Sequence, residues 1–266
     1  MNDFSLTRRS LFGCACCGAM VRPRVAIAVP GQDRGYPEAL ELGTTSMSRI
    51  APTVWVGRIA EGLFLYTTTA LIDGGIYYPA NGLILERDED AVLIDTTYGP
   101  EQAKTLLAWC ARHARPISLA IATHFHNDRT GGIPALRDAG IRTWAHPLTC
   151  ELARRRGLPV PEPIDAFSGD HHDMGPYLQL YAPGPAHTRD NIVAWLPRQQ
   201  NLFGGCMVKS TNSPSLGNVA DAVLRDWPAS VRRVRARYHA AKCVVPGHGA
   251  IAGDPIATTL SLLAKA

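Results

Sequence analysis

Four apolar segments of this chain break at a glycine or threonine, and a side chain that commonly binds metal ions follows within a few residues. The segments are "ISLAIAT", "YLQLYAP", "NLFGG" and "CVVP", and the side chains that follow them are His124, His126, Asp128, His187, Cys206 and His248. In an extended segment residues two apart point the same way, so His124, His126 and Asp128 can converge. Ligands spread so widely along a sequence meet on loops at the edge of a rigid scaffold, and this requirement constrains the fold.

The segments around these ligands predict strands in two groups, each followed by helices. β-Branched and aromatic runs predict strands at 53–59, 62–68, 81–86, 91–95, 117–123, 142–146, 177–183, 191–197, 201–205 and 242–247. Apolar spacings of three and four predict helices at 101–114, 133–140, 148–157, about 223–238 and near the C-terminus. A proline-rich connection at 157–170 separates the two groups. This order predicts an α/β (α+β) fold with two packed sheets and the helices outside.

The composition argues against a nucleic-acid partner. The chain of 266 residues can form one sizeable domain, and 46% hydrophobic with 19% charged residues is typical of a globular protein. The formal charge of +4 includes a net +3 from the first 28 residues, which carry four arginines and one aspartate, so the remainder has only +1. A nearly neutral body gives no reason to expect binding to a polyanion.

The N-terminal segment predicts export. Arg8 and Arg9 precede a short apolar run, residues 11–21, which is too short to span a bilayer as a mature helix. The pattern resembles a twin-arginine signal and predicts a periplasmic protein without stable membrane association. An unstructured arm on a cytosolic protein is the alternative, and the sequence leaves open the cleavage site and lipid attachment at Cys14. We expect a signal at 1–28, a flexible lead-in at 29–50 and a single domain at 51–266.

Six potential ligands suit two metal ions better than one. A tetrahedral zinc ion with an open place for water takes three protein ligands, so four histidines, one aspartate and one cysteine would serve a pair. Imidazole and thiolate select zinc over magnesium or calcium. Each residue alone has a plainer explanation, because a histidine after Pro-Gly is often a turn residue and Cys206 alone would more often be a core residue. Their joint placement at strand ends favours the metal site.

Six motifs give the chain a family resemblance. The segments "LIDTTYG", "THFHNDRTGG", "PGPAHTRDNIVAWLP", "LFGGCMVKS", "SLGNVADA" and "VVPGHG" occur in the order and at the spacing of metallo-β-lactamases. From about residue 53 to the end, the chain resembles the dizinc subclass in which Asp, Cys and His hold the second zinc. This resemblance implies an αββα sandwich. It also implies one zinc ion on His124, His126 and His187 and a second zinc ion on Asp128, Cys206 and His248.

The resemblance further implies zinc-dependent hydrolysis of the β-lactam ring of penicillins, cephalosporins and carbapenems, and hence antibiotic resistance. The implied nucleophile is a hydroxide that bridges two zinc ions. Asp128 would orient this nucleophile, Lys209 would bind the substrate carboxylate, and Asn218 would face the lactam carbonyl. The expected partner is a small β-lactam, and the expected oligomeric state is a monomer.

Two other functions remain open for this sequence: a zinc hydrolase of the same fold acting on another ester, lactone or phosphodiester, and a non-catalytic zinc-binding protein. Arg129 occupies a place where the wider superfamily commonly has histidine, and Cys206 is present, which points away from the thioesterases and nucleases of this fold. Lys209 and Asn218 count against a zinc-storage role, which needs neither. Arg129, Asp95 and Thr123 match positions that hold the ligands in place.

Several remaining residues carry weaker expectations. The stretch 67–81 predicts a hairpin with Gly74 and Gly75 at its turn, and we expect a mobile flap over substrate. The flap residues expected to touch substrate are Leu71, Ile72, Ile76 and Tyr77, and a purely structural hairpin is the alternative. The segment "DHHD" at 170–173 is interpreted as a solvated turn. Plain surface or filler positions are expected for His113, His146, His239, Cys110 and Cys243.

Overall fold

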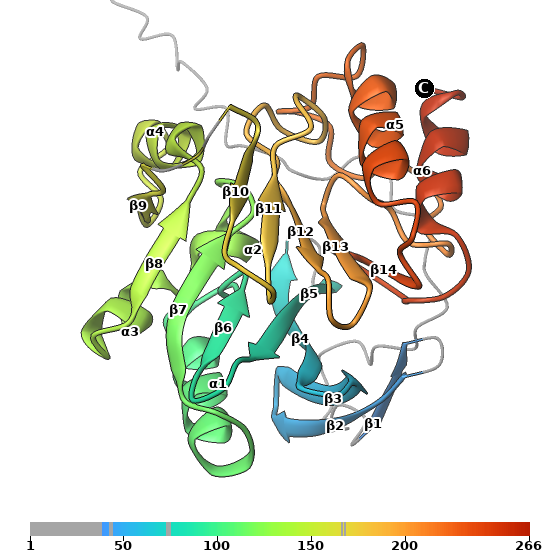
Figure 1. Cartoon of the computed structure of the whole chain (residues 1–266). Helices are drawn as coiled ribbons and strands as arrows, with labels where there is room; N and C mark the ends of the chain where they lie inside the picture. The colour runs from blue at the N-terminus through green and yellow to red at the C-terminus, as the bar shows by residue number, and fades with distance from the viewer. Residues whose placement is uncertain (1–38, 43–44, 73–75, 166, 168) are drawn as a thin grey trace, which may run out of the picture.

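The computed structural model of the chain describes residues 39–42, 45–72, 76–165, 167 and 169–266, and within these residues it contains two β-sheets (Figure 1). The first sheet has nine strands in sequence order: β1 (Ala39–Leu42), β2 (Thr45–Ala51), β3 (Val54–Ala60), β4 (Leu63–Ile72), β5 (Ile76–Glu86), β6 (Ala91–Ile94), β7 (Ile117–Ala122), β8 (Arg142–Ala145) and β9 (Glu162–Pro163). Neighbours from β1 to β6 are antiparallel, and those from β6 to β9 are parallel.

The second sheet has five strands in the described part of the chain: β10 (His171–Asp173), β11 (Gln179–Tyr181), β12 (Val193–Leu196), β13 (Asn201–Gly205) and β14 (Cys243–Pro246). Its neighbours are antiparallel except for the parallel pair β13 and β14. The helices of the described residues are α1 (Pro100–His113), α2 (Asn127–Thr130), α3 (Ile133–Asp138), α4 (Pro147–Arg155), α5 (Trp227–Arg237) and α6 (Pro255–Leu263).

Alternation along the first sheet explains how it buries both of its faces. In β6, Val92 and Ile94 belong to the core between the two sheets, whereas Ala91 and Leu93 belong to a separate cluster that includes Leu106 of α1. Successive side chains of a strand point to opposite faces, so one face meets the second sheet and the other meets a helix. Full burial of a leucine stabilises the fold by ~1.5–3 kcal/mol, and Leu106 is fully buried.

The second sheet also buries both of its faces, one against the first sheet and the other against helix α5. In β12, Ala194 and Leu196 face the core between the sheets, and Val193 joins Trp227 and Val231 of α5 in a cluster on the outer face. Figure 1 shows α5 and α6 side by side against this sheet, and the two helices contact each other. Helix, sheet, sheet and helix are therefore stacked in that order, which confirms the predicted αββα sandwich.

Local sequence explains where the longest helices begin and which face they bury. Pro100 opens α1, and Ala103, Leu106 and Cys110 form its buried face, as their spacing predicts. The helix predicted at 223–238 begins only at Trp227. Pro228 stands in its first turn, where a missing N–H is tolerated, and proline there favours a start at this point.

Two sequence-based expectations about loops are wrong. A flexible lead-in was expected at 29–50, of which residues 29–38 and 43–44 lie outside the described residues. In the described remainder this expectation is wrong, because β1 pairs with β2, β2 pairs with β3, and Met47 is fully buried. Residues 171–173 of the expected "DHHD" turn form β10, an edge strand paired with β11. β10 has only three residues, and in β2 the large apolar residues Met47 and Ile50 stand three apart, so neither segment shows the two-residue alternation that marks a strand.

Cysteine state and hydropathy complete the description of the fold. Cys110, Cys150, Cys206 and Cys243 are free thiols, and Cys110 is fully buried, as predicted, whereas Cys243 is only partly buried. Among the described residues, no helix is both long and apolar enough to cross a membrane.

Candidate active site

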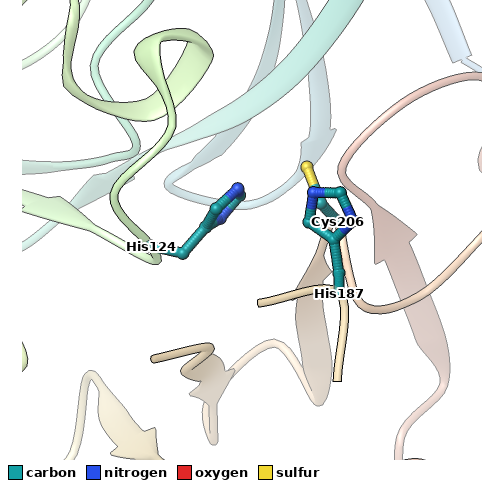
Figure 2. Close-up of side chains that lie close together, drawn as sticks. All are labelled: His124, His187 and Cys206. Atoms are coloured by element: carbon teal, nitrogen blue, oxygen red, sulfur yellow. The ribbon is translucent and has the colours of Figure 1, made fainter. Parts of the chain in front are cut away.

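Five of the six predicted metal ligands lie on loops that follow strands, and the sixth, Asp128, lies in the first turn of the short helix α2. All six meet at one place. His124 comes two residues after β7 of the first sheet, and Cys206 comes directly after β13 of the second. Because β13 and β14 run parallel, their carboxyl ends lie at the same edge, and this pairing brings Cys206 close to His248. Figure 2 shows His124, His187 and Cys206, which come from different parts of the chain and lie around a common space.

Three imidazole nitrogens form the first group. The Nδ1 atom of His126 lies 3.1 Å from Nε2 of His124 and 3.2 Å from Nε2 of His187. His124 is fully buried, and His187 is nearly so. Burial is the main reason that the pKa values of His124 and His187 lie well below the ordinary value, so both imidazoles are neutral and have a lone pair to offer. The three rings thus point nitrogen atoms at one centre.

The tautomer of His126 follows from a residue that the sequence analysis did not single out. Its other ring nitrogen, Nε2, lies 3.0 Å from Oδ2 of Asp221. An ionised carboxylate only accepts hydrogen bonds, so Nε2 of His126 carries the hydrogen and Nδ1 carries the lone pair that faces the other two rings. Asp221 lies within the motif "SLGNVADA", but its partner is 95 positions away, so no local signal marked it.

A second group contains one carboxylate, one thiol and one imidazole. Nε2 of His248 lies 3.1 Å from Sγ of Cys206 and 3.3 Å from Oδ2 of Asp128. The Sγ atom of Cys206 lies 3.7 Å from the same carboxylate oxygen. Nδ1 of His248 donates a hydrogen bond to the carbonyl oxygen of Pro79 at 2.7 Å, which leaves the lone pair of Nε2 directed at Cys206 and Asp128.

Strand β5 fixes the loop that carries His248. The amide nitrogen Nδ2 of Asn81 donates to the carbonyl oxygens of Pro246 at 3.1 Å and Gly249 at 2.8 Å. The ring of Tyr78 packs against the His248 ring, with 4.7 Å between the centroids. The loop is therefore held on both sides of His248 by hydrogen bonds to one buried side chain.

Arg129 lies beneath the second group and is fully buried. Its Nη2 atom lies 2.8 Å from Oδ2 of Asp128, 2.9 Å from Sγ of Cys206 and 2.9 Å from the Gly247 carbonyl oxygen. Its Nη1 atom pairs with Oδ2 of Asp95 at 2.9 Å. One planar guanidinium thus connects two of the potential ligands to the scaffold through rigid hydrogen bonds, a task for which a lysine ammonium is poorly shaped.

The ionisation of the second group depends on burial and on Arg129. Burial raises the pKa of the Cys206 thiol to about 12, although Arg129 opposes this shift. For Asp128, burial favours the neutral acid, but the attraction of Arg129 and His248 outweighs it and holds the carboxyl pKa well below its usual range. The Asp128 carboxylate is therefore ionised at neutral pH, whereas the Cys206 thiol needs a bound metal ion, in addition to Arg129, to become a thiolate ligand.

Asp95 and Thr123 support the first loop, as the sequence analysis expected of them. The carboxylate of Asp95 accepts hydrogen bonds from the Thr123 backbone N–H at 2.8 Å and from the Thr123 hydroxyl at 3.1 Å. Asp95 is fully buried, and burial raises its pKa to about 6 despite the opposing effect of Arg129. Asp95 therefore fixes the backbone immediately before His124 and also anchors Arg129.

Glycines next to the ligands are required by close backbone approach. A Cβ atom on Gly131 would lie 2.2 Å from the Tyr98 carbonyl oxygen, and one on Gly132 would lie 2.6 Å from that of Thr96. A Cβ atom on Gly247 would lie 2.7 Å from the backbone nitrogen of Cys206. The Gly-Gly and Pro-Gly signals that mark these loops in the sequence thus have a steric cause, because any side chain there would push the ligand loops apart.

The two polar residues expected to bind substrate, Lys209 and Asn218, occupy different environments. Lys209 is 9% exposed, its Nζ atom lies 5.3 Å from the centroid of the Trp227 ring, and burial lowers its pKa to about 8. Asn218 is exposed, and its side-chain oxygen accepts a hydrogen bond from the Ala220 backbone N–H at 3.0 Å.

The predicted hairpin is formed by β4 and β5, which pair from Leu63 opposite Leu85 to Ile72 opposite Ile76. Of the proposed flap contacts, Leu71 is 56% exposed. Gly74 and Gly75 lie outside the described residues, and so do the side chains of Ile72, Ile76 and Tyr77. The hairpin itself is confirmed, and its mobility and substrate contacts stay predictions.

The described residues fit zinc on the chemistry of their donors. In the first group, a single lone pair on His126 faces two imidazole nitrogens within 3.2 Å, and one lone pair accepts only one well-aligned hydrogen bond. A divalent cation at the centre gives each of the three nitrogens a partner. The ligand atoms of Asp128, Cys206 and His248 also lie within 4.8 Å of one another. Imidazole, thiolate and carboxylate together are a zinc donor set.

Known proteins share this fold and sequence. A family model described as the metallo-beta-lactamase superfamily matches residues 76–248. The chain is 36% identical to the metallo-beta-lactamase type 2 of Bacteroides fragilis over 210 residues, which cover 78% of this chain and 84% of that protein. It is 38% identical to the metallo-beta-lactamase type 2 of Bacillus cereus over 217 residues, which cover 80% of each chain. Among solved structures, the metallo-beta-lactamase FIM-1 from Pseudomonas aeruginosa in its mono-zinc form matches with a TM-score of 0.76 and 36% identity, over 80% of this chain and 96% of that chain. This chain therefore belongs to the metallo-beta-lactamase superfamily.

Proposed function

We propose that the chain is a zinc-dependent β-lactamase that hydrolyses the β-lactam ring of penicillins, cephalosporins and carbapenems and so confers resistance to them. The observation that carries this proposal is the convergence of six ligand atoms in two adjacent groups, each with three donors. Three protein donors leave an open position on a tetrahedral ion, which is the arrangement of a catalytic site, whereas structural zinc sites are closed by four. The similarity to type 2 metallo-beta-lactamases supports the same activity.

In this proposal each group holds one zinc ion. His124, His126 and His187 would bind the first through Nε2, Nδ1 and Nε2, the atoms that face one another. Asp128, Cys206 and His248 would bind the second. Bound zinc supplies Lewis-acid chemistry, since it polarises a carbonyl oxygen and lowers the pKa of water.

The remaining roles belong to the protein. Asp128 is ionised and lies beside both groups, so its carboxylate can accept a hydrogen bond from the attacking water and hold it in line with the lactam carbonyl. Lys209 would bind the substrate carboxylate by a charge-assisted hydrogen bond. Asn218 would donate its amide N–H to the lactam oxygen, where negative charge develops as the ring opens. Arg129 is fully buried, so its role is to position Asp128 and Cys206 and not to contact substrate.

The test is hydrolysis of a penicillin and of a carbapenem by the purified protein, followed by loss of absorbance of the lactam ring. The proposal expects turnover that a chelator abolishes and that added zinc restores. Turnover of esters, lactones or phosphodiesters without any β-lactam hydrolysis would replace it with another activity of the same fold. A zinc-loaded protein with no hydrolytic activity would favour a binding function instead.

We also propose that the protein acts in the periplasm as a monomer of one domain, after export by the twin-arginine route. The support for export is the sequence of residues 1–28, which lie outside the described residues. Replacing both Arg8 and Arg9 with lysine should leave the full-length protein in the cytosol, as cell fractionation would show. Export at the wild-type level by that variant would refute this route.

A further inference from the structure

One surface arginine, Arg156, is connected to the candidate zinc site through a single intervening side chain, Asp221. Arg156 follows α4, and its Nη2 atom pairs with Oδ1 of Asp221, while the other carboxylate oxygen of Asp221 faces Nε2 of His126 at 3.0 Å. The same guanidinium lies over the ring of Phe125, 5.6 Å from its centroid. Arg156, Asp221 and His126 therefore form a continuous chain of contacts from the surface to the first group of ligands.

The two side chains that Arg156 contacts, Asp221 and Phe125, both contact the imidazole of His126. Phe125 is 3% exposed, and its ring centroid lies 4.4 Å from that of His126. Asp221 uses one oxygen for Arg156 and the other for His126, so a shift of the guanidinium rotates the carboxylate that fixes the His126 tautomer. An isolated surface ion pair contributes little to protein stability. Here, however, Phe125 is buried and Asp221 contacts the potential metal ligand His126, so the arginine acts on groups next to the metal site.

The pair also connects two separate parts of the chain. Arg156 comes at the end of α4, which packs beside the first sheet near β9, and Asp221 lies in the loop between β13 and α5 that carries Lys209 and Asn218. Without this contact the Asp221 carboxylate would remain, but only the loop and the contact with His126 would set its orientation. The side chain of Asp221 is 20% exposed, so water can compete for the oxygen that Arg156 holds.

We propose that Arg156 is a positioning residue for zinc: through Asp221 and Phe125 it holds the His126 ring so that Nδ1 points at the first zinc ion. The inference rests on the proposed zinc site. Arg156 would raise the zinc affinity of the first site and restrict the orientation of the His126 ring. It does not require contact with substrate.

Zinc titration of the metal-free protein against a competing chromophoric chelator tests this role without any measurement of hydrolysis. Removing an outer partner of a metal ligand commonly weakens metal binding about 10- to 100-fold, and Arg156 acts one contact further out. We expect Arg156→Ala to raise the dissociation constant of the first zinc about 3- to 10-fold. Arg156→Lys should recover part of the loss, because it keeps the charge without the planar fork. Arg155→Ala is the matched control, since Arg155 pairs with Glu151 on the same helix.

A double-mutant cycle tests whether the effect passes through Asp221. In an Asp221→Ala background, Arg156→Ala should add less than a twofold change, because the two side chains act as one unit. In the zinc-loaded wild type, the Nε2 proton of His126 should give a protected NMR resonance that broadens or shifts in Arg156→Ala, while the melting temperature of the metal-free protein stays unchanged.

The outcomes separate this inference from the proposed function. A wild-type protein that binds no zinc would overturn both. Normal zinc binding in the wild type together with an unchanged dissociation constant in Arg156→Ala would overturn the inference alone. An equal loss in Arg155→Ala would also overturn it, because the effect would then not be specific to Arg156. An undiminished effect of Arg156→Ala in the Asp221→Ala background would overturn it as well, because the ion pair with Asp221 would then carry none of the effect.

Discussion

Replacing Arg129 with methionine tests how the second ligand group is supported. Methionine fills much of the same space but leaves the carboxylates of Asp95 and Asp128, which lie 2.9 and 2.8 Å from the guanidinium, without their buried partner. The carbonyl oxygens of Asn81 and Gly247 also lose a donor. Removing one member of a buried ion pair costs ~3–5 kcal/mol. For a chain of this size, a loss of about 4 kcal/mol lowers the melting temperature by ~8–16 °C.

The pH dependence of this loss follows from Asp95. Burial already raises the pKa of Asp95 to about 6, and Arg129 is the strongest of the interactions that oppose this shift, so in Arg129→Met the carboxyl pKa rises further. A carboxyl whose pKa is raised on folding stabilises the protein at low pH, and this contribution is lost as the pH rises through the folded-state pKa. The penalty of the substitution should therefore be smaller near about pH 5 than near about pH 8.

The assay is urea denaturation of the metal-free wild type and variant at both pH values, followed by circular dichroism. Arg129→Lys serves as a second variant that keeps the charge, and its loss should be smaller than that of Arg129→Met. Free energies of unfolding that agree within about 1 kcal/mol at both pH values would refute the idea that Arg129 neutralises two buried carboxylates.

Three further predictions concern zinc and substrate. Cys206→Ser should reduce the zinc content from two ions to one per chain, and metal analysis that still finds two would contradict the assigned second site. Lys209→Ala should raise KM for β-lactams ~10- to 100-fold at unchanged zinc content. Because burial lowers the Lys209 pKa to about 8, the wild-type KM should also rise as the pH increases above this value, and a flat KM profile would argue against Lys209 as the carboxylate site. Deleting residues 70–77 should raise KM about tenfold or more with two zinc ions retained, since Leu71 is exposed and available to substrate; unchanged kinetics would dispose of the flap.

The strand ends and their ligands were predictable because their signals are local. Each ligand follows an apolar run and a glycine or threonine, and the structure gives the steric reason at Gly131 and Gly247, where a Cβ atom would collide with backbone. The helix-forming faces were equally visible, as Leu106 and Cys110 in α1 show. Which ligands share a centre needed either the resemblance to a family or the three-dimensional structure.

What the sequence could not reveal depends on contacts between distant residues. β2 and β10 pair with β3 and β11, and neither shows a two-residue apolar alternation in its sequence. Asp221 and Arg156 are 65 positions apart and meet only in the folded chain. The chemical types of these two residues are common on any surface, so geometry alone identifies them.

The central claim is that six side chains from distant parts of the chain gather around two zinc ions. Anomalous diffraction measured on both sides of the zinc absorption edge, from crystals of zinc-loaded protein, tests it most directly. We predict two peaks, one within bonding distance of His124, His126 and His187 and the other within bonding distance of Asp128, Cys206 and His248. A map without zinc peaks here, or with a single ion that Cys206 does not contact, would contradict it.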